Sequence, residues 1–251
     1  MCILFIAQNR HPDYPLIICA NRDEFHHRAT QHMHEWPGTN GIRAGKDLKA
    51  GGTWLGFNAM GEVSALTNIR DLSATQEDRL SRGELVLKAL KGELSDDWLA
   101  QHSESYNPFN LLYQQQNQLY VFNSRSKENS LISDGFHAVS NGDLDDIWPK
   151  MARGKMALEQ AIVSQQSITP ESLLPMMLDQ SLPPEDSLPN TGVSLEWERR
   201  LSSIFICHPE YGTRSTSILL WHRSGKLECL EVRYNPKGKE LSRDKFRLQL
   251  S

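Results

Sequence analysis

The 251-residue sequence has little cysteine and no strong excess of charge of either sign. Four scattered cysteines are too few for the disulfide framework of a small secreted domain, so we expect free thiols at Cys2, Cys19, Cys207 and Cys229. Neither C-x-x-C nor C-x-x-C-H occurs, which argues against a zinc ribbon, a thioredoxin-type dithiol and a covalently attached haem. The net charge of −4 is spread without basic blocks, which argues against a nucleic-acid partner. We therefore expect a small-molecule ligand and no nucleic acid.

Long hydrophobic runs are also missing. No stretch approaches the roughly 20 apolar residues of a membrane-spanning helix, so we expect no membrane span. The opening MCILFIAQNR lacks the basic region and cleavage site of a signal peptide, which predicts a cytoplasmic location. Neither phosphate-binding glycine motif, G-x-x-x-x-G-K-[ST] or G-x-G-x-x-G, is present. At 39% hydrophobic residues, the chain can bury one sizeable core, and we expect a single domain over residues 1–251 of unknown oligomeric state.

Hydrophobic periodicity separates blocks of strands from blocks of helices. Short apolar or alternating runs predict strands at 1–7, 16–20, 53–58, 62–68, 109–113, 118–123, 136–140, 204–208, 215–221 and 227–234. A period near 3.6 predicts helices at 81–91, 96–102, 151–163 and 170–178, the first with Ser81 and Glu84 as a capping box. The segments 26–52 and 181–192 are predicted to be long loops. Blocks of this kind indicate an α+β fold with largely antiparallel sheets covered by helices.

Cys2 stands directly behind the initiator methionine. Methionine is commonly removed ahead of a small residue, so we expect Cys2 to become the first residue of the mature chain. One residue would then carry a nucleophilic thiol and an α-amine whose pKa is about 7.7–8.0, close enough to neutrality to act as its base. Terminal nucleophiles paired with such an amine are used for acyl transfer. The alternative is a small apolar side chain in an edge strand.

Six short motifs occur in order along almost the whole chain. They are MCI, ANRDEF, GGTWLGFN, ALTN, SNG followed by a Trp-Pro pair, and YGTRST. Together they resemble the NRDE family, also called transport and Golgi organisation 2. More distantly they resemble the cysteine N-terminal-nucleophile (Ntn) hydrolases, which include penicillin V acylases and bile salt hydrolases. The resemblance implies an αββα sandwich with helices on both outer faces.

The hydrolase resemblance also implies a set of site residues. Carried onto this chain, they fall on Cys2, Arg22, Asp23, Asn68, Asn141 and Arg214. Asp23 would orient the α-ammonium, Arg22 or Arg214 would favour the thiolate, and Asn68 or Asn141 would donate a hydrogen bond to the oxyanion. One departure is evident: Arg22 and Asp23 are adjacent here, and adjacent residues of a regular strand point to opposite faces. The sequence leaves open which of the two faces Cys2.

Two functions of different classes follow. The first is a cysteine amidohydrolase or acyltransferase that acts through Cys2 on a linear acyl amide and needs no cofactor or metal. The second, implied by the family resemblance, is a non-catalytic protein of haem or lipid and acyl-CoA trafficking. For the second, a haem would need an axial ligand, for which Cys2 or a histidine of the segment 26–34 is available. The histidines of that segment lack the spacing of an established metal site.

Overall fold

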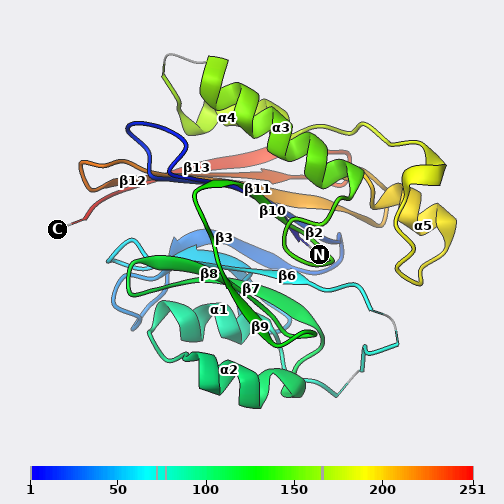
Figure 1. Cartoon of the computed structure of the whole chain (residues 1–251), viewed down its shortest axis with the longest axis horizontal. Coiled ribbons are helices and arrows are strands. Elements are labelled where there is room, and N and C mark those ends of the chain that lie inside the picture. The colour runs from blue at the N-terminus through cyan, green and yellow to red at the C-terminus, as the bar shows by residue number, and fades with distance from the viewer. Residues whose placement is uncertain (1, 72, 77, 165–166, 251) are drawn as a thin grey trace. The chain divides into compact units, whose positions relative to one another are not determined.

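The computed structural model of the chain describes residues 2–71, 73–76, 78–164 and 167–250. Met1, which the sequence placed in the first strand, lies outside the described residues. The chain forms two compact units, each assembled from separate stretches of sequence (Figure 1). The first unit comprises residues 1–27, 133–140 and 144–249, and the second comprises 28–132, 141–143 and 250–251. The expectation of a single domain stays a prediction.

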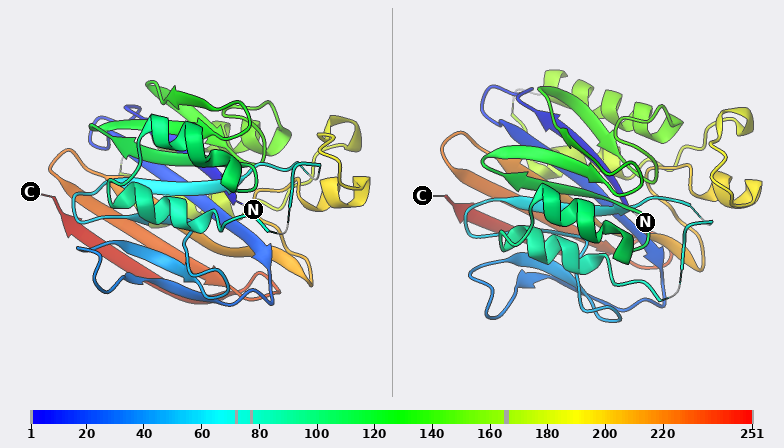
Figure 2. Two further views of the ribbon diagram at one scale, coloured as in Figure 1. Left: turned by 90° about the horizontal axis from the view of Figure 1, so that it is seen from below. Right: turned by 60° about the horizontal axis from the view of Figure 1, so that its bottom comes forward.

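The first unit is built on a six-stranded antiparallel sheet. Its strands, in spatial order, are β10 (Gly135–Val139), β1 (Cys2–Gln8), β2 (Leu16–Phe25), β11 (Tyr211–Trp221), β12 (Lys226–Tyr234) and β13 (Glu240–Gln249). Figure 2 shows β11, β12 and β13, coloured orange to red, side by side at one edge. Two helices, α3 (Pro149–Ser164) and α4 (Pro170–Met177), pack on this sheet, and α5 (Leu195–Arg200) precedes β11 in the chain (Figure 1).

Alternation along the strands decides which side chains face α3 and α4. Ile3 and Phe5 of β1 and Ile17 and Cys19 of β2 are fully buried in one cluster with Met151 and other side chains of the two helices. Residues at even positions of β1 and β2 therefore lie on the opposite face of the sheet. This division by face determines where each candidate site residue of this unit points.

The second unit is built on a seven-stranded antiparallel sheet. Its strands, in spatial order, are β3 (Thr30–Glu35), β4 (Arg43–Asp47), β5 (Leu55–Phe57), β6 (Val63–Asn68), β7 (Phe109–Gln115), β8 (Gln118–Asn123) and β9 (Glu128–Leu131). Helix α1 (Gly83–Leu90) packs on β5, β6 and β7, and α2 (Asp96–His102) follows it. Leu85, Val86 and Leu99 of these helices are buried with side chains of the sheet in a second apolar cluster.

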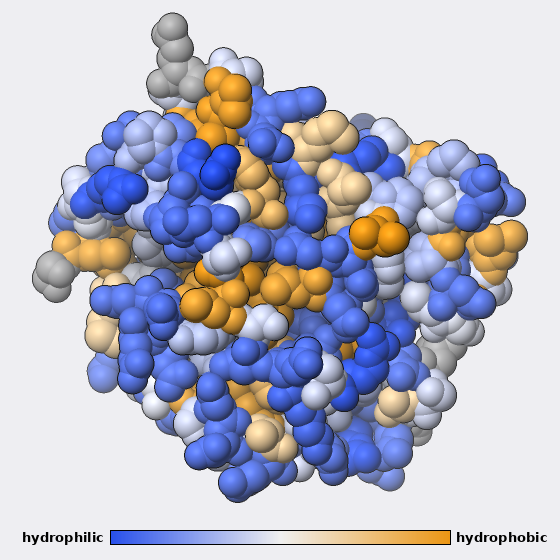
Figure 3. Space-filling model, viewed as in Figure 1, coloured by the Kyte–Doolittle hydropathy of each residue, from blue (hydrophilic) through white to orange (hydrophobic). Residues whose placement is uncertain are grey.

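The α+β class with largely antiparallel sheets is confirmed, because each unit joins one such sheet to helices. In the part of the chain that the structure describes, no helix combines the length and apolar character needed to span a bilayer. The face drawn in Figure 3 is mostly hydrophilic, with hydrophobic side chains in small groups. The four cysteines are thiols that form no disulfide with one another, as expected.

Several element predictions are wrong. The segment 26–52, predicted to be a loop, contains β3 and β4, whose polar alternation hid the strand period. The run 204–208 forms an isolated bridge rather than a strand. The predicted capping box is absent: the residue at the N-cap of α1 is Arg82, it makes no capping hydrogen bond, and the Glu84 carboxylate accepts from the Tyr106 hydroxyl instead. The strands β9 and β13 and helix α5 were not predicted.

Candidate active site

Cys2 and Arg22 are direct cross-strand neighbours at the end of the β1–β2 hairpin. Directly opposed residues of an antiparallel pair place their side chains on the same face of the sheet. Both side chains are buried, with Cys2 9% and Arg22 5% exposed. They lie on the face opposite α3 and α4, since Ile3 and Cys19 point toward those helices. Of the two residues whose orientation the sequence left open, Arg22 therefore faces the Cys2 thiol.

Asp23 lies on the other face of the same strand. Its neighbour two positions back, Asn21, donates through Nδ2 to the carbonyl oxygens of Met177 at the end of α4 (2.8 Å) and Ile204 (2.9 Å). Residues two apart in a strand share a face, so Asp23 points with Asn21 toward the helix-bearing side. Because Arg22 and Asp23 are adjacent, they point to opposite faces of the sheet. Arg22 lies beside the Cys2 thiol, and Asp23 is the next residue of β2, beside the start of β1.

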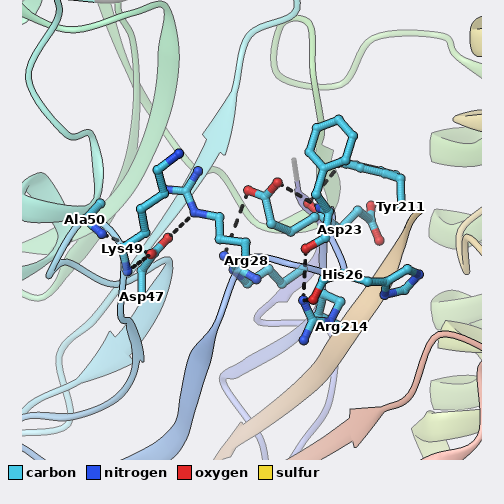
Figure 4. A network of polar contacts seen from close by, with 11 residues as sticks. Asp23, His26, Arg28, Asp47, Lys49, Ala50, Tyr211 and Arg214 are labelled. Carbon is cyan, nitrogen blue, oxygen red and sulfur yellow. Dashed lines mark hydrogen bonds and ion pairs between the residues drawn. The ribbon is translucent and has the colours of Figure 1, made fainter. Parts of the chain in front are cut away.

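The Asp23 carboxylate is held by hydrogen bonds from β11. Thr213, its cross-strand partner, donates from Oγ1 to Asp23 Oδ1 at 2.7 Å. The Thr213 Oγ1 in turn accepts from the backbone N–H of Ile206 at 2.9 Å. The Tyr211 hydroxyl donates to the backbone carbonyl of Asp23 at 3.0 Å (Figure 4). Asp23 is only 2% exposed, so both its backbone and its side chain are fixed within the first unit.

The pairing of β2 with β11 is interrupted by a β-bulge at Arg214. Asp23 pairs with Thr213 and Arg22 pairs with Ser215, which leaves Arg214 as the extra residue of β11. The Arg214 guanidinium is half-buried and donates from Nη1 to the carbonyl oxygens of Phe25 (3.0 Å) and His26 (3.1 Å) (Figure 4). This contact stabilises the end of β2. Burial and the neighbouring guanidinium of Arg22 lower the pKa of Arg214.

Burial dominates the electrostatics of the thiol. It raises the pKa of Cys2, while the positive charges of the chain's N-terminus and of Arg22 act in the opposite direction. The Cys2 thiol is therefore protonated at neutral pH in this structure. Of the two arginines considered for the thiolate, Arg22 is the one that acts on Cys2 from the directly opposed position.

Burial also raises the pKa of Asp23, to about 6. The positive charge of the chain's N-terminus, the hydrogen bond from Thr213 and the positive charges of Lys150 and Arg22 act against burial and lower this pKa. Lys150, near the start of α3, is itself only 4% exposed and donates from Nζ to the carbonyl oxygen of Leu201 at 3.1 Å. Because its pKa of about 6 is below neutral pH, Asp23 is mainly a carboxylate at neutral pH, although the protein interior favours the protonated acid more than bulk water does.

Asn68 and Asn141 lie in the second unit, where they contact each other. Asn141 Nδ2 donates to the carbonyl oxygen of Asn68 at 2.9 Å. Arg70 donates from its backbone N and its Nη2 to the carbonyl oxygen (2.8 Å) and Oδ1 (3.2 Å) of Asn141. Elsewhere in this unit, Arg28 Nε lies 2.7 Å from Asp47 Oδ2 (Figure 4). The structure thus brings Cys2, Arg22, Asp23 and Arg214 together in one unit and the two asparagines together in the other, and their oxyanion role stays a prediction.

The histidines considered as haem ligands belong to both units, His26 and His27 to the first and His32 and His34 to the second, and haem binding stays a prediction. His32 and His34 belong to β3, where His32 is exposed and the His34 ring stacks on Trp36. His26, in the first unit, contacts the carbonyl oxygen of His208 through Nε2 at 2.9 Å. Within the described residues, no three histidine, cysteine, aspartate or glutamate side chains are grouped as metal ligands.

The sequence prediction missed three polar residues around Asp23: Asn21, Thr213 and Lys150. Asn21 and Thr213 lie within the motifs ANRDEF and YGTRST, directly beside predicted site residues, so their motif membership was an available signal. Lys150 carried no such signal, because only the packing of α3 on the sheet brings it to Asp23.

These features define an α+β protein with a buried cysteine, arginine and aspartate at one end of an antiparallel sheet. The chain belongs to the Transport and Golgi organisation 2 family, whose profile matches residues 1–236. It is 28% identical over 276 residues to the Transport and Golgi organization protein 2 homolog of Bos taurus, covering 99% of this chain and 100% of that protein. The resemblance stated from the motifs is thereby confirmed.

Two solved structures are similar to this chain at 10% identity. The first is an N-acylethanolamine-hydrolyzing acid amidase ortholog of Caenorhabditis elegans, with a TM-score of 0.47 over 87% of this chain and 92% of that chain. The second is a C2A mutant of the conjugated bile acid hydrolase of Clostridium perfringens, with a TM-score of 0.49 over 100% of this chain and 98% of that chain.

Proposed function

We propose that this protein is a cysteine amidohydrolase or acyltransferase that uses Cys2 on a linear acyl amide. The observation that carries the proposal is the strand register, which opposes Cys2 to Arg22 and places Asp23 at the next position of β2. In the proposal, Arg22 acts on the thiol of Cys2 and Asp23 acts on the α-amine of the same residue. Arg22 is on the thiol side, and Asp23 flanks the start of the strand, where removal of Met1 would leave an α-amine.

The buried thiol gives the α-amine a specific task. Because burial raises the pKa of Cys2, a thiolate does not form without a base beside it. A free α-amine on the same residue supplies that base, and the Asp23 carboxylate stabilises the ammonium formed when the amine takes the proton. Arg22 stabilises the resulting thiolate. Removal of Met1 is therefore part of the proposal, because a peptide nitrogen at this position is no base.

The reaction then follows from these groups. The Cys2 sulfur attacks the amide carbonyl carbon to give a tetrahedral intermediate, whose oxyanion needs a hydrogen-bond donor. The hydrolase resemblance predicts Asn68 or Asn141 for that role. The carbon–nitrogen bond breaks as the leaving amine takes the proton from the α-ammonium, which leaves a thioester on Cys2. Water, or a second acceptor in acyl transfer, attacks that thioester and restores the thiol. A hydrolase releases a carboxylic acid and an amine.

The alternative is a non-catalytic protein that carries haem, lipid or acyl-CoA. The names of the relatives refer to transport and Golgi organisation and state no reaction, which is compatible with this reading. A carrier requires neither Met1 removal nor a reactive Cys2, so the two functions differ at the first residues of the chain. The site geometry favours the enzyme, because a carrier has no need of a carboxylate buried beside the start of β1.

The test is the intact mass of the purified protein before and after brief treatment with iodoacetamide. We expect a mass lacking Met1 and one adduct that forms first and is absent from Cys2→Ser. Cys207→Ser is the matched control, since it removes the exposed cysteine and should leave that adduct in place. A panel of N-acyl amides then tests for an acyl adduct on Cys2. A mass retaining Met1, or labelling of Cys2 no faster than of the other cysteines, would contradict the enzyme and favour the carrier.

A further inference from the structure

Two polar residues that the proposed reaction does not use, Thr213 and Lys150, act on the carboxyl of Asp23. The carboxyl of Asp23, which is 2% exposed, accepts a hydrogen bond from a hydroxyl of β11, and the positive charge of a buried lysine of α3 acts on it. Burying a carboxylate is unfavourable unless hydrogen bonds and opposite charges compensate for its lost hydration. Thr213 supplies such a hydrogen bond and Lys150 such a charge. Neither is one of the six site residues implied by the hydrolase resemblance.

The direction of the Thr213 hydrogen bond is fixed by its second partner. Thr213 Oγ1 accepts from the backbone N–H of Ile206 at 2.9 Å, so its single hydrogen is free to point toward Asp23 Oδ1 at 2.7 Å. The backbone supports the same geometry, because Thr213 N donates to the carbonyl oxygen of Ile206 at 2.8 Å. The hydroxyl is therefore oriented as a donor, which favours the ionised form of Asp23.

The bulge explains why Thr213 reaches Asp23. Arg22 is opposed to Ser215, and in a regular ladder the next residue of β2 would be opposed to residue 214. The extra residue in β11 replaces Arg214 with Thr213 opposite Asp23. A bulky guanidinium is thereby directed to the end of β2, and a short hydroxyl occupies the position beside the carboxylate.

Lys150 provides the complementary charge from the helix layer. It is 4% exposed, its Nζ is held by the carbonyl oxygen of Leu201 at 3.1 Å, and its positive charge acts on Asp23. A lysine this deeply buried is seldom found without a charged partner. Thr213 by a hydrogen bond from β11 and Lys150 by its charge from α3 thus both favour the ionised form of Asp23.

We propose that Thr213 and Lys150 are positioning residues that keep Asp23 ionised and aimed at the α-amine of Cys2. This inference rests on the proposed function, because the α-amine exists only after Met1 is removed. Without the two residues, Asp23 would take up a proton near neutral pH and lose its attraction for the ammonium. The α-amine would then be a weaker base, since a nearby carboxylate is what favours its protonated form.

The experiment compares wild type, Thr213→Val, Thr213→Ser and Lys150→Gln in two measurements. The first is the titration of the Asp23 carboxyl carbon by NMR in protein labelled with ¹³C-aspartate. The second is the pH profile of Cys2 alkylation by iodoacetamide, read from intact mass. In Thr213→Val we expect the Asp23 midpoint to rise by about one pH unit or more, the size expected for a lost hydrogen bond to a charged group. Thr213→Ser should restore the wild-type value, and Lys150→Gln should raise the midpoint independently.

The alkylation profile should change with the same variants, because a neutral Asp23 no longer supports proton transfer from the thiol. An unchanged Asp23 midpoint in both Thr213→Val and Lys150→Gln would overturn the inference, as would a shifted midpoint that leaves the alkylation profile unchanged. Failure of the proposed function is distinct, since wild-type Cys2 would then show no preferential alkylation. If Thr213→Val does not fold, Lys150→Gln is the remaining test, and an unchanged Asp23 midpoint in that variant overturns the inference.

Discussion

Replacing Asp23 with asparagine should stabilise the folded protein at neutral and alkaline pH. Burial raises the pKa of this carboxyl from 3.8 to about 6 even with its hydrogen bond to Thr213 in place. A rise of about two units means that ionised Asp23 costs the folded state about 3 kcal/mol, at 1.36 kcal/mol per unit. Asparagine keeps an oxygen that accepts from Thr213 and removes the buried charge. We expect Asp23→Asn to raise the free energy of unfolding by about 1–3 kcal/mol. The gain can fall below the full cost of ionisation because the neutral amide loses the attraction that the Lys150 charge exerts on a carboxylate.

The pH dependence provides the sharper measurement. The folded-state pKa of Asp23 lies above its unfolded value, so the folded state binds more protons between pH 3.8 and about 6. The cost of ionisation is absent below that window and fully present above it. In urea denaturation, the free energy of unfolding of Asp23→Asn should therefore exceed that of wild type at pH 8, and the difference should shrink toward zero near pH 4.

Asp179→Asn is the matched control. Burial opposes ionisation there too, but hydrogen bonds from Ser181 and an ion pair with Arg153 lower the pKa of Asp179 overall. That substitution should destabilise the protein at pH 8. If Asp23→Asn is instead destabilising at pH 8, or its effect does not change with pH, the carboxylate is better compensated than we infer. Loss of Cys2 labelling in a more stable Asp23→Asn protein would be the sign of a functional charge kept at a cost in stability.

Two further predictions concern the first unit. His137 contacts Asp145 through Nδ1 at 2.7 Å, and this hydrogen bond raises the pKa of His137, so its stabilising effect should be complete below pH 6.5 and disappear as pH rises through the higher folded-state pKa. His137→Gln should flatten this dependence in denaturation measured from pH 6 to 9, and parallel slopes for the two proteins would contradict it. Gly154→Ala should lower the free energy of unfolding by about 1–3 kcal/mol or more, because the added Cβ would lie 2.0 Å from Cζ of Phe5. A helix glycine without such a contact would gain stability from the same change, so a more stable Gly154→Ala in urea denaturation would refute the packing argument.

Local periodicity located most of the elements correctly. Helix α2 and strand β8 have the predicted bounds, and the hairpin of β1 and β2 was expected from two apolar runs around a proline-containing connection. Polar residues predominate in the missed strands β3 and β13. The polar alternation of β3 and the charged edge strand β13 resemble loops in sequence, because their pairing partners rather than their own hydrophobicity hold them in the sheets.

The sequence by itself determined the family, the α+β class and the identity of the candidate nucleophile, since these depend on short motifs and on residue order. It could not decide which of Arg22 and Asp23 faces Cys2, because that depends on strand register. Register, together with the bulge at Arg214, places Arg22 on the thiol side and Asp23 beside Thr213. The charge of Lys150 acts on Asp23 only because α3 packs on the sheet. Such long-range pairings set burial and charge at each atom, so the tertiary structure alone decided the electrostatics of the site.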